Sequence, residues 1–156
     1  MDASTIRPLA TADLPAVAAL LERLARKFIT PGFPQEAEAD FLRKNDAAAI
    51  GVFVRDGHTY WVAESQGQIV GFAGMRGHSH LYHLFVAEEM QQRGVGRKLW
   101  NTARQASLEC GNPGRFTVNA SDNAVRVYEA FGFVRAGLPR DSNGVVYNPM
   151  VLVVDG

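Results

Sequence analysis

The chain has 156 residues, 47% of them apolar and 21% charged, and its 16 basic residues balance its 16 acidic ones. A chain of this length and composition fits one domain over residues 1–156 and is not typical of a disordered protein. Zero net charge provides no overall field that attracts nucleic acid or an anionic membrane, so we expect neither as a partner. The single cysteine, Cys110, excludes an intramolecular disulfide, and residues 1–4 do not resemble a signal peptide, so we expect a cytoplasmic protein.

The first predicted elements are a short strand and an amphipathic helix. Residues 5–8 form the strand in this interpretation, and Thr11 is the expected N-cap of the helix. The apolar side chains of the helix recur at spacings of three and four, which places them on one face: Leu14, Val17, Leu21, Leu24 and Phe28. The segment 30–34 ends the helix, and we expect this loop to form one wall of a substrate site.

A second helix is predicted over residues 35–44, and no element is predicted between Asn45 and Tyr60. After it come three runs of β-forming residues separated by short turns that contain glycine: 60–64, 69–76 and 80–86. Three antiparallel strands are the simplest interpretation of this spacing.

The C-terminal half of the chain alternates strands with helices. One helix follows Gly96 and ends near Gly111, where Pro113 prevents its continuation. Three more elements complete the chain: a fifth strand at 116–119, a short helix at 123–131 and a hairpin that turns at 141–144. This order of elements predicts an α/β (α+β) domain in which helices cover both faces of a mixed sheet.

The segment from Gln91 to Gly96 is a glycine-rich turn that leads into a helix. Unpaired backbone N–H groups and the positive end of the helix macrodipole favour a phosphate or pyrophosphate at such a turn. Arg93, Arg97 and Lys98 add positive charge around it. The alternative interpretation is a tight turn with solvated basic residues. A dinucleotide fingerprint and a P-loop are both excluded by the residues that follow the two glycines.

Two ordered motifs resemble those of the GNAT N-acetyltransferases. The first is a strand that ends in apolar-x-Val, here Leu84-Phe85-Val86, followed five residues later by Q/R-x-x-G-x-G/A, here residues 91–96. The second is A-x-x-x-Y-x-x-x-G-F, which is matched by Ala124, Tyr128, Gly132 and Phe133. The order of elements is also similar to that of the family over almost the whole chain.

The resemblance implies a fold and a co-substrate. The GNAT fold has a mixed, mostly antiparallel sheet of six to seven strands, about four flanking helices, and fourth and fifth strands that splay apart. The pantetheine arm of acetyl-CoA then adds like an extra strand along Leu84, Phe85 and Val86. The turn wraps the CoA pyrophosphate, and the turn residues implied to contact acetyl-CoA are Gln91, Gln92, Arg93, Gly94, Val95, Gly96, Arg97 and Lys98.

The family places its general acid at the position of Tyr128, which also contacts acetyl-CoA. A phenol with a pKa of about 10 protonates a thiolate only when it is positioned against it. The alternative is an ordinary packed tyrosine on a short helix. For the oxyanion, we expect the backbone N–H of Phe85 or Val86 to polarise the thioester carbonyl, because a bulged strand end leaves such groups free.

We expect the general base in the stretch from His80 to His83. The two-residue period of a strand places His80, Tyr82 and Leu84 on one face and His83 on the other. Several GNAT families carry a catalytic glutamate or histidine at the place of His80, and arylalkylamine-type members have histidines at the positions of His80 and Tyr82. The resemblance therefore implies catalytic roles for His80 and Tyr82. A hydrogen-bonded or surface histidine is the alternative for His80.

One position departs from the family pattern. Many GNAT proteins hold the pantetheine with an asparagine three residues before the alanine of the tyrosine motif, whereas this chain has Ser121 there. We expect the flanking Asn119 and Asn123 to contact acetyl-CoA instead, and the alternative is that Ser121 or Asn123 simply begins the helix. No metal site is predicted, because the histidines lack a cysteine or carboxylate at ligand spacing.

These observations predict an acetyl-CoA-dependent N-acetyltransferase that acts on a primary amine of a small molecule or peptide by direct attack in a ternary complex. The alternative function is a non-catalytic sensor that binds acyl-CoA. Walls of the acceptor site are expected around residues 28–33, at Tyr60, Trp61 and Tyr82, and in the hairpin near 140–147. Family analogy leaves a homodimer open.

Overall fold

The computed structural model describes residues 4–142 and 144–154. Within these residues the chain forms five α-helices: α1 (Leu14–Phe28), α2 (Gln35–Arg43), α3 (Ala47–Arg55), α4 (Val95–Glu109) and α5 (Val125–Ala130). It also forms eight strands: β1 (Thr5–Pro8), β2 (Thr59–Ser65), β3 (Gln68–Arg76), β4 (His80–Val86), β5 (Arg115–Ala120), β6 (Val134–Arg135), β7 (Arg140–Ser142) and β8 (Val145–Val153). Short 3-10 turns occupy Thr11–Asp13, Glu88–Met90 and Asp122–Ala124.

The strands form a mixed sheet in the order β1-β2-β3-β4-β5-β8-β6, and β7 also pairs with β8. Every pairing is antiparallel except that of β4 with β5. The predicted α/β architecture with a mostly antiparallel sheet is confirmed. The described residues contain eight strands rather than six to seven, because β6 and β7 are pieces of two and three residues. The predicted hairpin is the β7–β8 pair, and Asn143 in its turn lies outside the described residues.

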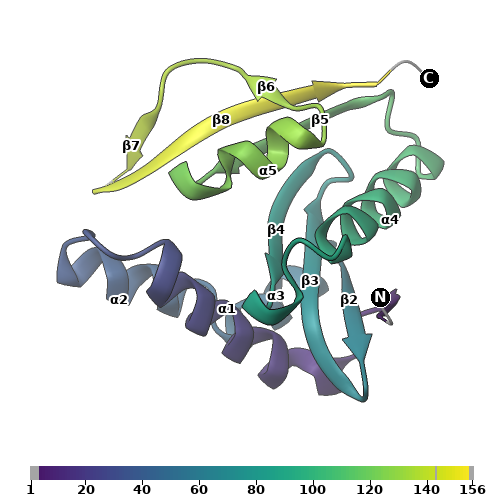
Figure 1. Ribbon diagram of the computed structural model, residues 1–156, viewed down its shortest axis with the longest axis horizontal. Coiled ribbons are helices and arrows are strands. Elements are labelled where there is room, and N and C mark those ends of the chain that lie inside the picture. The colour runs from purple at the N-terminus through teal and green to yellow at the C-terminus, as the bar shows by residue number, and fades with distance from the viewer. Residues whose placement is uncertain (1–3, 143, 155–156) are drawn as a thin grey trace.

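The two parallel strands β4 and β5 separate soon after they meet. They pair only at His80↔Thr117 and Leu81↔Val118, whereas the β3–β4 pairing continues to Val86. Figure 1 shows β5 and β8 turning away from β2, β3 and β4 beyond this point. The splayed fourth and fifth strands expected from the resemblance are therefore present.

Helices cover both faces of the sheet. Gly71 of β3 faces Leu99 and Val95 of α4, which packs over β2, β3 and β4. The next residue, Phe72, points to the opposite face, because successive side chains alternate along a strand, and its ring lies 5.9 Å from that of His83. Phe53 of α3 reaches the same histidine, and α1 packs against α3. The core thus has an α4 side and an α1–α3 side.

Helix α3 was not predicted from the sequence. Its residues form an almost uninterrupted apolar run with Gly51 in the middle, so they show no amphipathic period, and such a run does not distinguish a helix from a buried strand. The helix begins after Asp46, whose carboxylate accepts a hydrogen bond from the Ala49 N–H at 2.9 Å. This N-cap is the local signal that could have identified the helix.

The N-terminal cap predicted at Thr11 is wrong. Thr11 is the first residue of a 3-10 turn, and α1 begins at Leu14. The carboxylate of Asp13 instead accepts the Ala10 N–H at 2.7 Å and two hydrogen bonds from the Arg7 guanidinium. Arg7 also binds Glu64 of β2, so a paired acidic side chain, and not a threonine hydroxyl, fixes the start of the helix.

Gly74 gives a test of the packing beneath the cleft. The Tyr60 ring fills the space where a side chain at Gly74 would stand. We expect Gly74→Ala to lower the free energy of unfolding by about 1–3 kcal/mol, because the ring must leave its place or the strand must shift. The measurement is urea denaturation, and the matched control is Gly51→Ala. A side chain at Gly51 makes an ordinary 3.5 Å contact with Leu14, so the control should be neutral or stabilising.

Candidate active site

A cleft of about 640 Å³ opens where β4 and β5 separate. One half of its lining comes from β4, the turn before α4 and the connection from β5 into α5. The other half comes from the end of α1, from α2 and from the β7–β8 hairpin. The predicted site residues that line the cleft are His80, Tyr82, Leu84, Phe85, Val86, Gln91, Gln92, Gly96, Asn119, Asn123 and Tyr128.

The turn between β4 and α4 has the backbone conformation of an anion-binding loop. Gln92 and Gly94 have positive φ angles of 64° and 85°, and Gly94 is the N-cap of α4. Gly94 provides no side-chain cap, so the first N–H groups of α4 keep their donor capacity at the positive end of the helix dipole. The side-chain amide of Gln91 donates to the Val86 carbonyl at 3.0 Å and thereby ties the turn to the end of β4.

The basic residues of the turn have different surroundings. Arg93 is exposed. The Arg97 guanidinium donates to the Ala130 carbonyl at 3.2 Å and lies over the Phe131 ring, 5.1 Å from its centroid. The Lys98 ammonium donates to the Ser4 carbonyl at 2.7 Å. Neither Arg97 nor Lys98 lines the cleft, and the same holds for Arg93, for Gly94 and for Val95, which is part of the core.

The outer edge of β4 offers two backbone donors to the cleft. The Ala87 N–H donates to the Val70 carbonyl at 2.8 Å, on the side of β3. Because N–H directions alternate along an antiparallel pair, the Phe85 N–H also points toward β3, whereas those of Leu84 and Val86 point to the side that β5 has left. Of the two oxyanion donors expected from the sequence, the geometry thus supports Val86 and not Phe85.

A β-bulge changes the facing of the side chains in β4. Gly74 pairs with His83 and Met75 pairs with Leu81, so Tyr82 is an extra residue in the ladder. The Tyr82 and His83 rings lie 4.6 Å apart, on the same side of the strand. The prediction that His83 faces away from Tyr82 is therefore wrong, because the strand period of two does not hold across a bulge.

Tyr128 lies on α5 with its ring packed edge-on against Phe131 and Phe133. Its side chain is buried yet lines the cleft, and its hydroxyl has no hydrogen-bond partner among the described residues. Burial raises the pKa of Tyr128 above its ordinary value, so the phenol stays protonated at neutral pH. The structure thus provides an uncommitted O–H donor in the wall of the cleft.

The asparagines that flank Ser121 both line the cleft. Ser121 stands at the N-cap position of the 3-10 turn before α5, but its hydroxyl donates to the Asn123 side-chain oxygen at 2.8 Å and accepts no capping hydrogen bond from the backbone of that turn. Asn148, which the sequence did not single out, is buried and holds the end of β5 in place. Its amide donates to the Ala120 carbonyl at 3.0 Å and to Asp122 at 2.8 Å.

His80 belongs to the first of the two residue pairs that join β4 and β5, and the strands part after the next pair, Leu81↔Val118. Its Nδ1 is 2.8 Å from the hydroxyl oxygen of Thr117, its partner on β5, and this contact leaves Nε2 as the ring nitrogen available to the cleft. Burial, together with the nearby Arg76 and His58 charges, lowers the pKa of His80 to about 4. The imidazole is therefore neutral at pH 7 and can accept a proton.

His83 belongs to a buried chain of hydrogen bonds that the sequence did not predict. The Asn45 amide donates to the Phe41 carbonyl at 2.8 Å, which directs its oxygen toward His83 Nε2 at 2.8 Å. Nε2 is thus the protonated nitrogen, and Nδ1 accepts from the Tyr60 hydroxyl at 2.7 Å. Burial lowers the pKa of His83 to about 3. With both nitrogens occupied, His83 orders the floor of the cleft.

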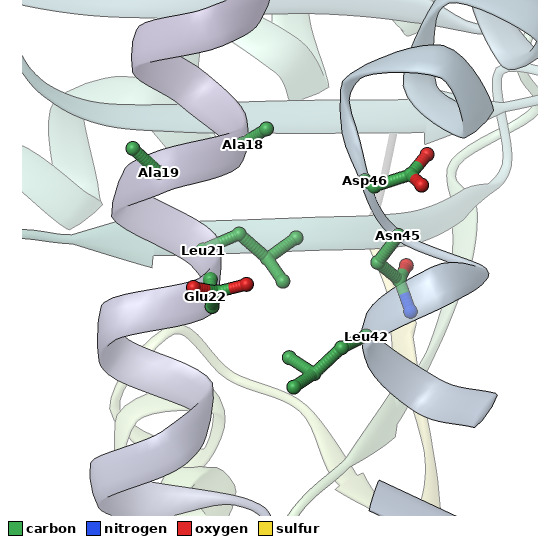
Figure 2. A pocket seen from close by; sticks show the side chains of 7 residues that line it. All are labelled: Ala18, Ala19, Leu21, Glu22, Leu42, Asn45 and Asp46. Atoms are coloured by element: carbon green, nitrogen blue, oxygen red, sulfur yellow. The ribbon is translucent and has the colours of Figure 1, made fainter. Parts of the chain in front are cut away.

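Asn45 also borders a second, smaller cavity of about 150 Å³ between α1 and the α2–α3 junction. Figure 2 shows Leu21 and Leu42 pointing toward one another across this hollow, with Asn45 beside Leu42. Asn45 therefore lines both the small hollow and the main cleft.

The low pKa values of His80 and His83 have a consequence for stability. The unfolded chain protonates these histidines below a pH of about 6.5, whereas the native protein does not do so until pH about 4 for His80 and about 3 for His83. The free energy of unfolding should therefore fall as the pH drops from 6.5 toward 4.

We expect His83→Gln, which cannot titrate, to be less stable than the wild type at pH 7.5. The gap between the two proteins should narrow by up to about 1.4 kcal/mol per pH unit between pH 6.5 and pH 4. Urea denaturation at several pH values measures this gap. A gap that stays constant over this range would show that His83 titrates normally in the folded protein.

The described residues contain neither a candidate metal site nor a helix that could span a membrane. No group of three or more histidine, cysteine, aspartate or glutamate side chains in this part of the chain is arranged to hold a metal ion. No helix of residues 4–142 and 144–154 is long and apolar enough to cross a membrane.

Comparison with known proteins decides the family. The family model described as "Acetyltransferase (GNAT) domain" matches residues 29–154, which is most of the chain. The chain belongs to the GNAT acetyltransferase family. The matched region contains β4, the glycine turn, the β4–β5 opening and Tyr128, which are the features that form the cleft.

Individual relatives agree with this family. The chain is 33% identical over 93 residues to the probable N-acetyltransferase camello of Xenopus laevis, a match that covers 52% of this chain and 41% of the relative. The aligned part thus spans less than half of that longer protein. A GCN5-related N-acetyltransferase from Rhodopseudomonas palustris is 24% identical, with a TM-score of 0.81 over 99% of this chain and 98% of the other.

A further solved structure is PaiA N-acetyltransferase from Thermoplasma acidophilum, which was determined in complex with coenzyme A. It is 14% identical to this chain and has a TM-score of 0.80, covering 98% of this chain and 100% of the other. At these identities, the two solved N-acetyltransferase structures establish the fold that they share with this chain.

Proposed function

We propose that this GNAT protein transfers an acetyl group from acetyl-CoA to a primary amine of a small molecule or peptide by direct attack in a ternary complex. The observation that carries the proposal is the opening between β4 and β5. It brings a free strand edge, an anion-binding helix N-terminus, an uncommitted tyrosine hydroxyl and a neutral histidine to one cleft.

The residues present fit acetyl-CoA. The Leu84 and Val86 backbone groups on the open edge of β4 suit the amides of the pantetheine arm, which pairs with a strand edge as another strand would. The N–H groups after Gly94 suit the pyrophosphate. Asn119 and Asn123 supply side-chain amides on the opposite wall. The structurally similar Thermoplasma protein, which binds coenzyme A, supports this choice of co-substrate.

Acetyl-CoA supplies a thioester whose acetyl group an amine can attack. The Val86 N–H is placed to donate to the negative charge that develops on the acetyl oxygen. His80 Nε2 accepts the proton that the amine nitrogen loses as the new C–N bond forms. Tyr128 donates its proton to the departing sulfur. Tyr82 packs beside both histidines and shapes this end of the cleft, so we assign it a positioning role.

The first test is calorimetric binding of acetyl-CoA, with NADH and ATP as controls and with salt varied to reveal the phosphate contribution. We expect salt-sensitive binding of acetyl-CoA alone, followed by release of free CoA thiol when an amine is added. Binding without thiol release for any amine would favour the acyl-CoA sensor, and no binding by the folded protein would reject both functions.

Tyr128→Phe tests the general acid. We expect kcat to fall by about 10-fold or more, because removal of a positioned proton donor typically costs that much, while the Kd of acetyl-CoA is nearly unchanged. Steady-state thiol release and calorimetry give the two values. A kcat within about twofold of the wild type would remove Tyr128 from the chemistry.

Substitution of Thr117 tests whether its hydroxyl orients the His80 imidazole. For His80 Nε2 to accept a proton, Nδ1 must carry hydrogen and donate it to Thr117. We expect His80→Gln to lower kcat by about 100-fold and Thr117→Val by about 10-fold, and Thr117→Ser should restore most of the activity. The Kd of acetyl-CoA should be unchanged in all three. Wild-type turnover in Thr117→Val would show that the hydroxyl does not position the base.

A further inference from the structure

The half of the cleft that faces away from the glycine turn contains little available charge. Among the described residues that line it, the only acidic side chain is Asp40, and its carboxylate is 2.8 Å from the Lys44 ammonium. Arg43 binds the same carboxylate. The Lys44 and Arg43 charges hold the pKa of Asp40 below its usual range, so it remains ionised and paired. No other carboxylate of the described lining is available to a cationic group.

The same half of the cleft presents apolar surface to solvent. Phe28 on α1 is 38% exposed and Val146 on β8 is 44% exposed, and both line the cleft from facing walls. Phe28 is the last residue of α1, and it lies in the segment 28–33 that the sequence predicted as a wall of the acceptor site. Ile29, Phe41 and Val145 extend the apolar lining. Exposed apolar side chains that gather in a pocket indicate an apolar ligand.

The two walls meet at the rim. Gly144, in the β7–β8 turn, lies against Pro34 at the start of α2, and a side-chain carbon at Gly144 would stand 3.1 Å from the proline ring. The wall on the α1–α2 side is itself held in place, since the buried Thr30 hydroxyl donates to Glu38 and the Phe33 ring packs edge-on against Phe41. The acceptor half is therefore a chamber that is bridged at this point of its rim, and the bridge lies in the path of an extended polypeptide that crosses it.

Resting on the proposed function, we propose that the acceptor is a small monoamine whose amino group is joined to an uncharged apolar body. The apolar body occupies the chamber between Phe28 and Val146 and leaves the amino group at the catalytic end near His80. A second ammonium on the acceptor would be buried against apolar side chains without a free carboxylate, which is unfavourable. The chamber therefore selects against diamines and polyamines, and its bridged rim selects against peptides.

The experiment compares kcat/KM for hexylamine and hexane-1,6-diamine, which share a six-carbon chain and differ only in the second, terminal amino group. We expect hexylamine to exceed the diamine by at least about tenfold. It should also exceed a heptapeptide with a free N-terminus. Diamine or peptide turnover equal to or faster than that of hexylamine would overturn the acceptor class while leaving the transferase function intact. Absence of thiol release with all three amines would reject the transferase function itself.

Variants in the chamber walls test whether these walls determine the preference for a monoamine. Phe28→Glu and Val146→Glu each place an unpaired carboxylate in one wall. We expect either change to shift the ratio of kcat/KM for hexylamine to kcat/KM for the diamine at least about fivefold toward the diamine. Leu138→Glu is the matched control, because Leu138 is 85% exposed and does not line the cleft, so its ratio should equal that of the wild type. A ratio that is unchanged in both chamber variants, or shifted equally in the control, would overturn the proposal.

Discussion

The early parting of β4 and β5 is the constraint on which the rest of the site depends. Two residue pairs join the strands, and beyond them the outer N–H groups of Leu84 and Val86 have no neighbouring strand to bond. A buried amide without a partner is costly, so such an edge is stable only where water or a ligand reaches it. The same parting leaves His80 at the vertex of the opening and brings α5, with Tyr128, to the opposite wall. One irregularity in the sheet therefore creates both the open strand edge and the end of the cleft to which we assign binding and catalysis.

Polar groups inside the core hold β4 in place near the point where it parts from β5. Asn45, His83 and Tyr60 come from a loop and two strands, and their hydrogen bonds leave each of the histidine nitrogens with a single defined role. Gly74 makes room for the Tyr60 ring, so the hydrogen-bonded chain and the sheet packing depend on each other. Burial removes His83 from water. The two hydrogen bonds compensate the neutral imidazole for this loss of solvation but not the charged form, so the pKa of His83 is low. Rigid support of this kind keeps the neighbouring His80 and Tyr82 in place.

The two halves of the cleft differ in polarity, in the same way as the two substrates that we propose for it. The half beside the glycine turn is rich in backbone donors and side-chain amides, as a nucleotide with a peptide-like arm requires. The other half is apolar, and Asp40, the one acidic side chain among its described lining residues, is already paired with Lys44. An amine that enters there gains little from electrostatic attraction, and burial of its apolar body provides the binding energy. Specificity for the acceptor would then come mainly from what the chamber excludes.

The sequence alone determined the features that depend on near neighbours in the chain. The glycine turn, the strand before it and the tyrosine on α5 are local patterns of backbone conformation and spacing, so the sequence predicted the family, the fold and most of the cleft lining. Helix α3 was missed because a uniform apolar run has no period. Only the tertiary structure decided that Tyr82 lies in a bulge, that Lys98 binds Ser4, and that Thr117, Asn45 and Tyr60 are the partners of the histidines. These contacts join residues 23 to 94 positions apart, and no local preference specifies them, because they arise from the packing of strands and helices.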